Sequence, residues 1–107
     1  MEETEFAALA EQTLERIEAS LEESGVDADV QLKPGGVIEI EYADGSKMII
    51  NRHAAAREIW VAARSGGYHF RHDGSAWRDT RDGGELFAAV SRLASEQAGA
   101  AVVLKPA

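Results

Sequence analysis

Apolar and polar residues alternate with a period of two through the middle of the chain. In residues 38–42, two isoleucines and a tyrosine alternate with two glutamates, which is the pattern of a β-strand with one buried face. Residues 47–52 read as the partner strand, with Met48 and Ile50 directed to the same core. Asp44-Gly45 lies between the two segments and predicts a tight type I′ turn, in which both central residues have positive φ. This stretch therefore predicts a β-hairpin.

The register of the hairpin sends a second set of side chains to the face opposite the core. If residues 58–62 form the next strand, Ile59 and Val61 point inward, and Trp60 joins Asn51 on the outer face. A large aromatic side chain on the solvent side of a sheet is typical of a binding surface. We therefore interpret Asn51 and Trp60 as candidate partner-binding residues.

The remaining strands are marked less clearly. Residues 53–64 combine alanines, which favour a helix, with Ile-Trp-Val, which favours a strand, so the pattern leaves this segment open. Alternation predicts further strands over residues 27–33 and 68–72, and a short last strand over 76–79. Glycine-containing segments predict the turns between them: Pro34–Gly36, Ser65–Gly67 and Asp73–Gly74.

Helical periodicity appears at both ends of the chain. Residues 4–24 carry an apolar stripe at spacings of three and four residues, with Thr4 as the predicted N-cap. Residues 82–98 carry a second stripe, with Asp82 as the predicted N-cap and Glu85 as its capping-box partner. Each stripe is followed by a glycine that favours a helix end: Gly25 and Gly99.

The predicted order is a helix, five or six antiparallel strands, and a second helix. Successive hairpins form a meander, and two amphipathic helices can cover only one face of such a sheet. We therefore expect a single α+β domain over residues 1–107, a two-layer α-β-sandwich with the N- and C-terminal helices on one face. The apolar tail at residues 101–104 is expected to run extended beside the helices.

Negative charge is concentrated at the start of the chain. The 107 residues carry a formal net charge of −8, and residues 1–29 hold ten acids and a single base, a net −9. Phosphate contacts need clustered Lys and Arg, so we expect no direct binding of nucleic acid. Cations or a basic protein surface are the expected partners.

Seven of these carboxylates, which we call the acidic ridge, are candidate metal ligands. Those in the first helix recur largely at spacings of three or four residues, which places them along one edge, and oxygen donors suit hard cations. Water would complete the coordination shell, so binding should be weak. A solvated helix face, with charge that keeps an edge strand from pairing, explains the same pattern, and the residues leave the choice open. The candidates are Glu11, Glu15, Glu18, Glu22, Glu23, Asp27 and Asp29.

Several other chemistries find no support in the sequence. The chain has no cysteine, which excludes disulfides and thiolate sites. Its serines lack a nucleophile motif and its histidines lack the spacing of a metal motif. No apolar run approaches the roughly 20 residues that span a membrane, and no signal-peptide pattern is present. We expect a cytoplasmic protein without a catalytic site.

Several short motifs together resemble one family. They are Thr-Glu-Phe before the acidic helix, Gly-Ser-Lys-Met-Ile-Ile-Asn-Arg over residues 45–52, Ile-Trp at 59–60, Gly-Gly-Tyr-His-Phe over 66–70 and Gly-Glu-Leu-Phe over 84–87. The combination resembles the frataxin family, in particular the bacterial frataxin homologues of the CyaY type, over nearly the whole chain. The resemblance implies a frataxin-like α-β-sandwich and makes residues 58–63 a strand.

The resemblance also implies a function. It predicts an iron-binding regulatory or adaptor protein of iron–sulfur cluster assembly, with weakly bound, exchangeable Fe²⁺ or Fe³⁺ on the acidic ridge. The expected partners are the cysteine desulfurase, bound through Glu18, Glu22 and Asp29, and the cluster scaffold protein. Asn51 and Trp60 match positions that the family uses on the exposed sheet. We expect a monomer that oligomerises with excess iron.

The chain departs from the family pattern before the Ile-Trp pair. Where relatives commonly have Gln, Pro and Gln, this chain has His53, Ala55 and Glu58, and Glu58 places a charge where an amide is expected. Two alternative functions stay open. One is an iron-oxidising or iron-storage protein of the ferroxidase type, and the other is a plain acidic interaction domain whose metal binding is incidental.

Overall fold

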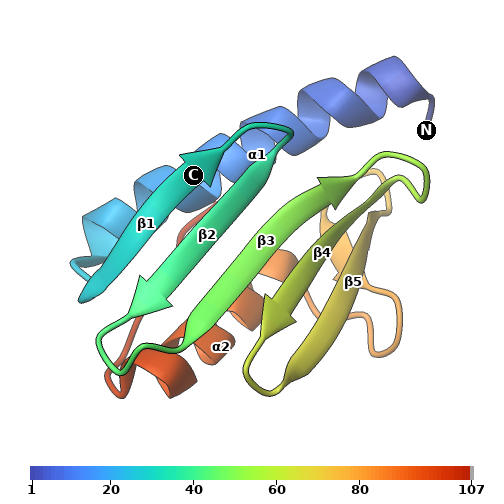
Figure 1. The fold of residues 1–107 in the computed structure, drawn as a ribbon. Coiled ribbons are helices and arrows are strands. Elements are labelled where there is room, and N and C mark those ends of the chain that lie inside the picture. Colours follow the sequence, from blue (N-terminus) through green and yellow to red (C-terminus); the bar gives the residue numbers. More distant parts are fainter. Residues whose placement is uncertain (107) are drawn as a thin grey trace.

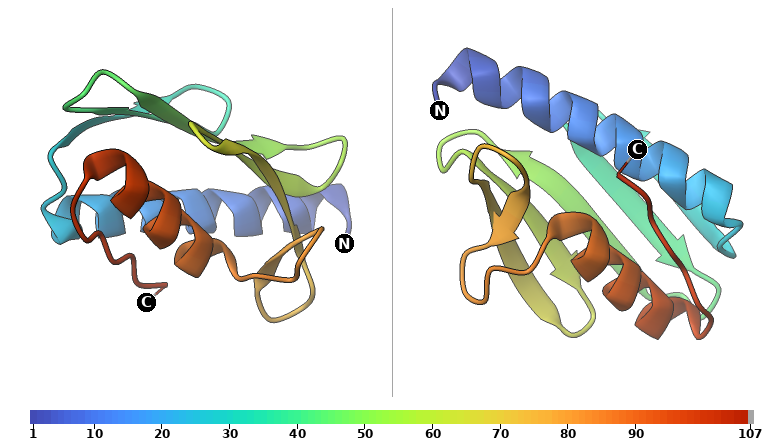
Figure 2. Two further views of the ribbon diagram at one scale, coloured as in Figure 1. Left: turned by 90° about the horizontal axis from the view of Figure 1, so that it is seen from below. Right: turned by 180° about the vertical axis from the view of Figure 1, so that it is seen from behind.

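The protein folds into two layers, a sheet and a pair of helices (Figure 1). A computed structural model describes residues 1–106. The six strands form one antiparallel sheet in sequence order, and both helices lie on the same face of it (Figure 2). The predicted α-β-sandwich is therefore confirmed. The elements are α1 (Glu3–Ser24), β1 (Ala28–Lys33), β2 (Val37–Tyr42), β3 (Lys47–His53), β4 (Glu58–Ala63), β5 (Gly66–His72), β6 (Trp77–Asp79) and α2 (Leu86–Ala98).

Helix α1 buries one stripe of side chains and exposes the rest. Phe6, Ala10, Ile17 and Leu21 are buried at the spacing that the sequence predicts. Gly25 ends the helix with a φ of 71°, as predicted. Neither helix within residues 1–106 is long and apolar enough to cross a membrane.

The helix N-caps differ from the prediction. Helix α1 begins after Glu2, which makes no side-chain capping bond, and Thr4 lies inside the helix. The N-cap of α2 is Glu85, whose carboxylate accepts hydrogen bonds from two backbone N–H groups of the first turn. Asp82 instead accepts from the N–H of Gly84 at 2.8 Å. The predictions for Thr4 and Asp82 are therefore wrong, because a periodic pattern locates a helix end only to within a residue or two.

The sheet supplies the other half of the core, and strand β4 comes from residues 53–64, which the sequence pattern leaves open. This segment divides into a turn over residues 54–57, where Arg57 has a positive φ of 55°, and strand β4. The segment forms a strand despite the helix propensity of its alanines, because β4 pairs with a strand on each side and buries its alternate side chains. The fully buried residues of β2, β3 and β4 are Ile38, Ile40, Met48, Ile50, Ile59 and Val61.

Two of the predicted turns differ in detail. Between β2 and β3 only Gly45 has positive φ, at 85°, so the turn is not of type I′. The N–H of Gly45 donates to the carbonyl of Tyr42 at 2.9 Å, and the Asp44 carboxylate accepts from the N–H of Ser46 at 2.9 Å, a local bond that this short side chain favours. The glycine pair expected in the later turn opens β5, where Gly66 faces the last residue of β4.

The C-terminal tail runs beside the two helices (Figure 2). Val102 and Leu104 are buried, which confirms the predicted apolar packing. Hydroxyls of Ser91 and Ser95 on α2 and of Ser20 on α1 accept hydrogen bonds of 2.8 Å from its backbone N–H groups. The tail therefore joins the two helices through both apolar contact and hydrogen bonds.

Candidate functional site

The acidic ridge is centred on one edge of α1. Glu11, Glu15, Glu18 and Glu22 recur on this helix at spacings of three and four residues. Three of them are exposed and Glu18 is half-buried. None of the four forms a salt bridge within residues 1–106. Because none of these four carboxylates has an ion-pair partner among the described residues, they remain available to a cation or a basic surface.

The other three ridge residues lie apart from that edge. Glu23 sits further round α1, where its carboxylate pairs with Arg16 at 3.1 Å. Asp27 is exposed in the connection between α1 and β1. Asp29 lies on the outer face of β1 and accepts a hydrogen bond from Gln31 at 3.1 Å. The structure thus gives a helical edge of four free carboxylates, flanked by two aspartates and by one glutamate that already has a cationic partner.

The donor chemistry of the ridge fits a weakly held hard cation. Carboxylate oxygens are the ligands that such cations prefer. Within residues 1–106, no three His, Asp or Glu side chains stand close enough together to form a ready metal site. An ion held by only one or two carboxylates keeps most of its water. The arrangement therefore suits exchangeable binding of a hydrated ion.

On the outer face of the sheet, Trp60 sits between two imidazole rings. The His53 ring stacks on the indole with centroids 3.8 Å apart and an interplanar angle of 12°. The His69 ring stacks on it at 4.3 Å and 8°. The outward position of Trp60 agrees with the sequence prediction, but the sequence analysis did not identify the two histidines as its neighbours. The cross-strand register of Asn51, Trp60 and His69 is the signal that would have placed the His69 ring.

Glu58 holds the indole in this stack. Its side chain is only 7% exposed. One carboxylate oxygen accepts from Trp60 Nε1 at 2.8 Å and the other accepts from Arg71 Nη2 at 2.7 Å. Burial raises the pKa of the Glu58 carboxyl, but the hydrogen bonds from Trp60 and Arg71 outweigh burial and hold this pKa below its ordinary value of 4.5. The charge that replaces the family's amide is therefore fully partnered.

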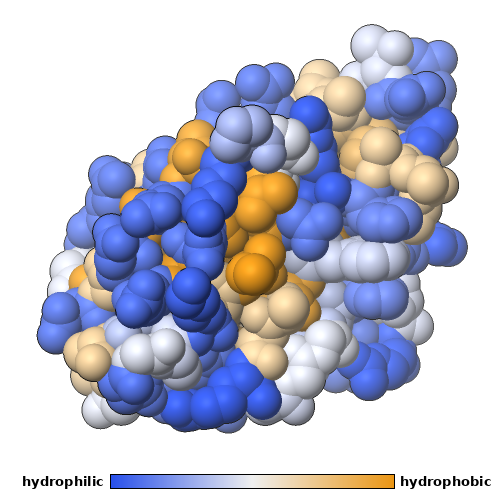
Figure 3. Space-filling model, in the orientation of Figure 1, coloured by the Kyte–Doolittle hydropathy of each residue, from blue (hydrophilic) through white to orange (hydrophobic). Residues whose placement is uncertain are grey.

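Apolar surface lies in the middle of the outer face, between hydrophilic side chains (Figure 3). Ile49 is 38% exposed and pairs in register with Ala62. Asn51 is half-buried, and its amide donates to the carbonyl of Arg52 at 3.1 Å. Because imidazoles cover both faces of the half-buried indole, Trp60 offers its ring edge to a partner.

Acid should destabilise the fold partly through Glu58. Its folded-state pKa is depressed, so its ionised form stabilises the fold above the unfolded-state pKa, and this contribution disappears as the pH falls through the folded-state pKa. Glu58→Gln should lower the free energy of unfolding at neutral pH by about 1–3 kcal/mol. The variant should then lose less stability than the wild type between neutral pH and about pH 3. Urea unfolding of both proteins measures these losses, and equal losses would contradict the assignment.

Comparison with known proteins places the chain in a family. Residues 1–100 match the frataxin-like domain. The chain is 62% identical over 105 residues to the iron–sulfur cluster assembly protein CyaY of Dechloromonas aromatica, covering 98% of this chain and 100% of that protein. It is 54% identical over 107 residues to the protein of the same name from Cupriavidus necator, covering 97% and 96%. The solved frataxin from Psychromonas ingrahamii matches with a TM-score of 0.89 at 30% identity, over 98% of this chain and 99% of that one. The motif resemblance is thereby confirmed, and the chain belongs to the frataxin family.

Proposed function

We propose that the protein binds iron on its acidic ridge and acts in iron–sulfur cluster assembly as a regulatory adaptor of the cysteine desulfurase, without catalysing a reaction itself. The observation that carries this proposal is the edge of α1 on which four carboxylates have no basic partner within residues 1–106. The names of the relatives, iron–sulfur cluster assembly proteins, support the part of the proposal that assigns this process. Iron is here a cargo or signal, held loosely enough to exchange.

Removing carboxylates from the α1 edge should weaken iron binding. Replacing Glu15, Glu18 and Glu22 with glutamine takes away three of the four free donors, and we expect the affinity for Fe²⁺ to fall at least about tenfold, since hard cations need charged oxygen ligands. The variant should be slightly more stable, because like charges at this spacing cost about 0.2–0.5 kcal/mol per pair. Anaerobic calorimetric titration with Fe²⁺ measures the affinity.

A control with the same change in net charge shows whether the position of the carboxylates, rather than the total charge, determines iron affinity. Replacing Glu3, Asp82 and Glu96 with the corresponding amides changes the charge equally, away from the α1 edge, and should leave the affinity unchanged. Glu23→Gln should have a smaller effect than any single change on the edge, because Arg16 already pairs with Glu23. Unchanged affinity in the triple variant of the edge would rule out the ridge as the iron site.

The same ridge is proposed to dock on a basic surface of the desulfurase, through Glu18, Glu22 and Asp29. We propose that the outer face, with Asn51 and Trp60, contacts a second partner, the cluster scaffold protein. The α1 edge belongs to a helix that covers one face of the sheet (Figure 1), whereas Trp60 alternates with the buried Ile59 and Val61 and so lies on the opposite face. Two partners could therefore be held at once by a monomer.

Oxygen uptake separates this proposal from an iron-oxidising or iron-storage protein. An adaptor adds no oxidation of its own, so aerobic addition of Fe²⁺ should consume oxygen no faster with the protein than in a buffer blank. Uptake that rises in proportion to protein, and falls when Glu15, Glu18 and Glu22 become glutamine, would support the ferroxidase alternative.

A further inference from the structure

The Trp60 stack is built from three neighbouring strands of the sheet. The indole comes from β4, the His53 ring from β3 and the His69 ring from β5, with the two imidazole centroids 3.8 Å and 4.3 Å from the indole. Trp60 is in register with His69, and His53 is in register with Glu58. Imidazole is the side chain whose charge ordinarily changes near neutral pH, so the charge on both faces of the indole depends on pH.

A proton on His69 has two attractive neighbours. The Nδ1 atom of this ring lies 3.7 Å from Oε1 of Glu58, the same oxygen that accepts from Trp60 Nε1 at 2.8 Å. At 3.7 Å the neutral ring makes no hydrogen bond to the carboxylate. A cation stacked on an indole is attracted by the ring face. Protonated His69 is therefore held by the carboxylate and the indole together, whereas neutral His69 is held by stacking alone and, at 48% exposure, has solvent to turn into.

His53 gains less from a proton. Its Nδ1 accepts a hydrogen bond from the N–H of Ala56, in the turn between β3 and β4, at 3.3 Å. A ring nitrogen that accepts a hydrogen bond carries no proton, so adding one there breaks this bond and sets two N–H groups against each other. The attraction of the new cation for the indole is offset by this loss. His69 is thus the ring at which a proton changes the stack.

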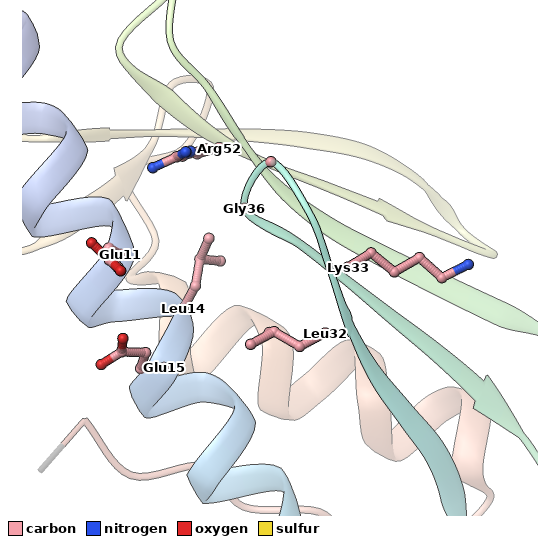
Figure 4. A pocket seen from close by; sticks show the side chains of 8 residues that line it. Glu11, Leu14, Glu15, Leu32, Lys33, Gly36 and Arg52 are labelled. Carbon is pink, nitrogen blue, oxygen red and sulfur yellow. The ribbon is translucent and has the colours of Figure 1, made fainter.

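Glu58 is the carboxylate that contacts the stack. Its other oxygen accepts from Arg71 Nη2 at 2.7 Å, so a permanent cation occupies one oxygen and a proton on His69 places an intermittent cation at the other. Arg71 repels that proton and Glu58 attracts it. Arg52 of β3 lies on the opposite face, in a pocket against α1 (Figure 4). Other charged side chains of the neighbouring strands and turns have partners of their own: Arg57 with the Ala54 carbonyl, Arg78 with Asp73, Glu39 with Lys33 and Lys47, and Arg81 with the Gly67 carbonyl.

We propose that the stack is a pH-sensitive clamp on Trp60, in which proton uptake by His69 fixes this ring against the indole and proton loss releases it. In the clamped state the imidazoles cover both faces of the indole, and only the ring edge is open to a partner. In the released state His69 turns toward solvent and adds one face of the indole to the apolar surface. The inference rests on the proposed docking at the outer face and adds its regulation, since acid weakens the contact.

Nuclear magnetic resonance of the histidine rings tests the clamp in the protein alone. As the pH falls from about 8 to about 6, the range in which imidazole changes charge, the signal of the Trp60 indole N–H should shift together with those of His69. Glu58→Gln keeps an acceptor for Trp60 Nε1 but removes the charge, and should move the His69 titration to lower pH. His72 is the internal control, because its ring lies against Trp77 and its titration should stay in place. A His69 titration that Glu58→Gln does not move, or a Trp60 signal that does not follow it, would overturn the clamp.

Binding of the scaffold protein at the two ends of this pH range tests the regulation. His69→Phe keeps an aromatic cover that takes up no proton, and the ratio of wild-type to variant affinity cancels any pH dependence of the scaffold itself. This ratio should fall about two- to fivefold from the alkaline to the acid end, as expected for one cation–indole contact. His53→Phe, a matched change on the other face of the indole, should keep the wild-type pH dependence.

The outcomes separate the clamp from the proposed docking. A ratio that is equal at both ends, or a pH dependence that His53→Phe removes, would overturn the assignment to His69. If the histidine signals behave as expected and the scaffold binds neither the wild type nor His69→Phe, the clamp stands and the proposed docking at the outer face fails.

Discussion

Reversing Glu22 and Asp29 to lysine is expected to abolish binding of the cysteine desulfurase while the fold stays intact. Both residues are exposed, so their replacement leaves the core untouched. The change places two positive charges where the proposed contact needs negative ones, and like-charge juxtaposition at an interface costs several kcal/mol. Calorimetric titration of the desulfurase measures binding, and circular dichroism with urea unfolding measures the fold.

A charge-matched control and a salt titration test whether the contact is local and electrostatic. Reversing Asp82 and Glu96 to lysine changes the net charge equally and should leave binding nearly unchanged. Wild-type binding should weaken as salt is added, because the Debye length is about 8 Å at physiological ionic strength and shortens further above it. Binding that survives both the reversal of Glu22 and Asp29 and high salt would locate the contact on another surface.

Replacing Trp60 with alanine is expected to abolish docking of the scaffold protein with a moderate loss of stability. The side chain is half-buried, its ring contacts the stacked imidazoles of His53 and His69, and its Nε1 donates to Glu58. Each stacked pair and the hydrogen bond contribute about 0.5–1.5 kcal/mol, so the free energy of unfolding should fall by about 2–4 kcal/mol. A tryptophan at the centre of a contact often supplies much of the binding energy. Iron binding should be unchanged, because the ridge lies elsewhere.

Trp77 provides the contrast that makes this result interpretable. It is 4% exposed, its Nε1 donates to the Thr13 hydroxyl at 3.0 Å, and its ring meets Phe6 edge to face at 6.0 Å. Trp77→Ala should cost about 3–5 kcal/mol, a large part of the stability of a small domain. Fluorescence of a Trp77→Phe variant isolates Trp60. Emission typical of a fully buried indole, or loss of folding in Trp60→Ala, would contradict the surface assignment.

The order of elements could be predicted from the sequence because burial imposes a period. Alternation around Ile38 and Ile50 marks strands, and the three- and four-residue spacing around Ile17 marks a helix, since each pattern brings apolar side chains to one core. Turn and cap details could not be predicted in the same way. Asp44-Gly45 suits several turn types, and the backbone angles and the bonds from the Gly45 and Ser46 N–H groups distinguish among them only in the folded chain.

The sequence could predict which residue types form the candidate sites and on which face of an element they lie. The carboxylates of α1 and the outward position of Trp60 follow from spacing. The pairing of Glu23 with Arg16 does not, because it depends on side-chain conformation across seven positions of the helix.

The strand order carries a consequence for how the chain reaches this fold. Every strand pairs with its neighbour in sequence, so each hairpin closes a short loop at a small cost in chain entropy. The helical layer is assembled over much longer separations. Thr13 meets Trp77 64 positions later, and Ser20 binds the N–H of Lys105 85 positions later.

The helical layer is complete only when the C-terminal tail lies beside α1 and α2. Without Val102 and Leu104, the space that these two buried side chains occupy beside the helices would be open to water. Exposed apolar surface of this kind favours aggregation. The tail therefore shields the helices from solvent as well as joining them.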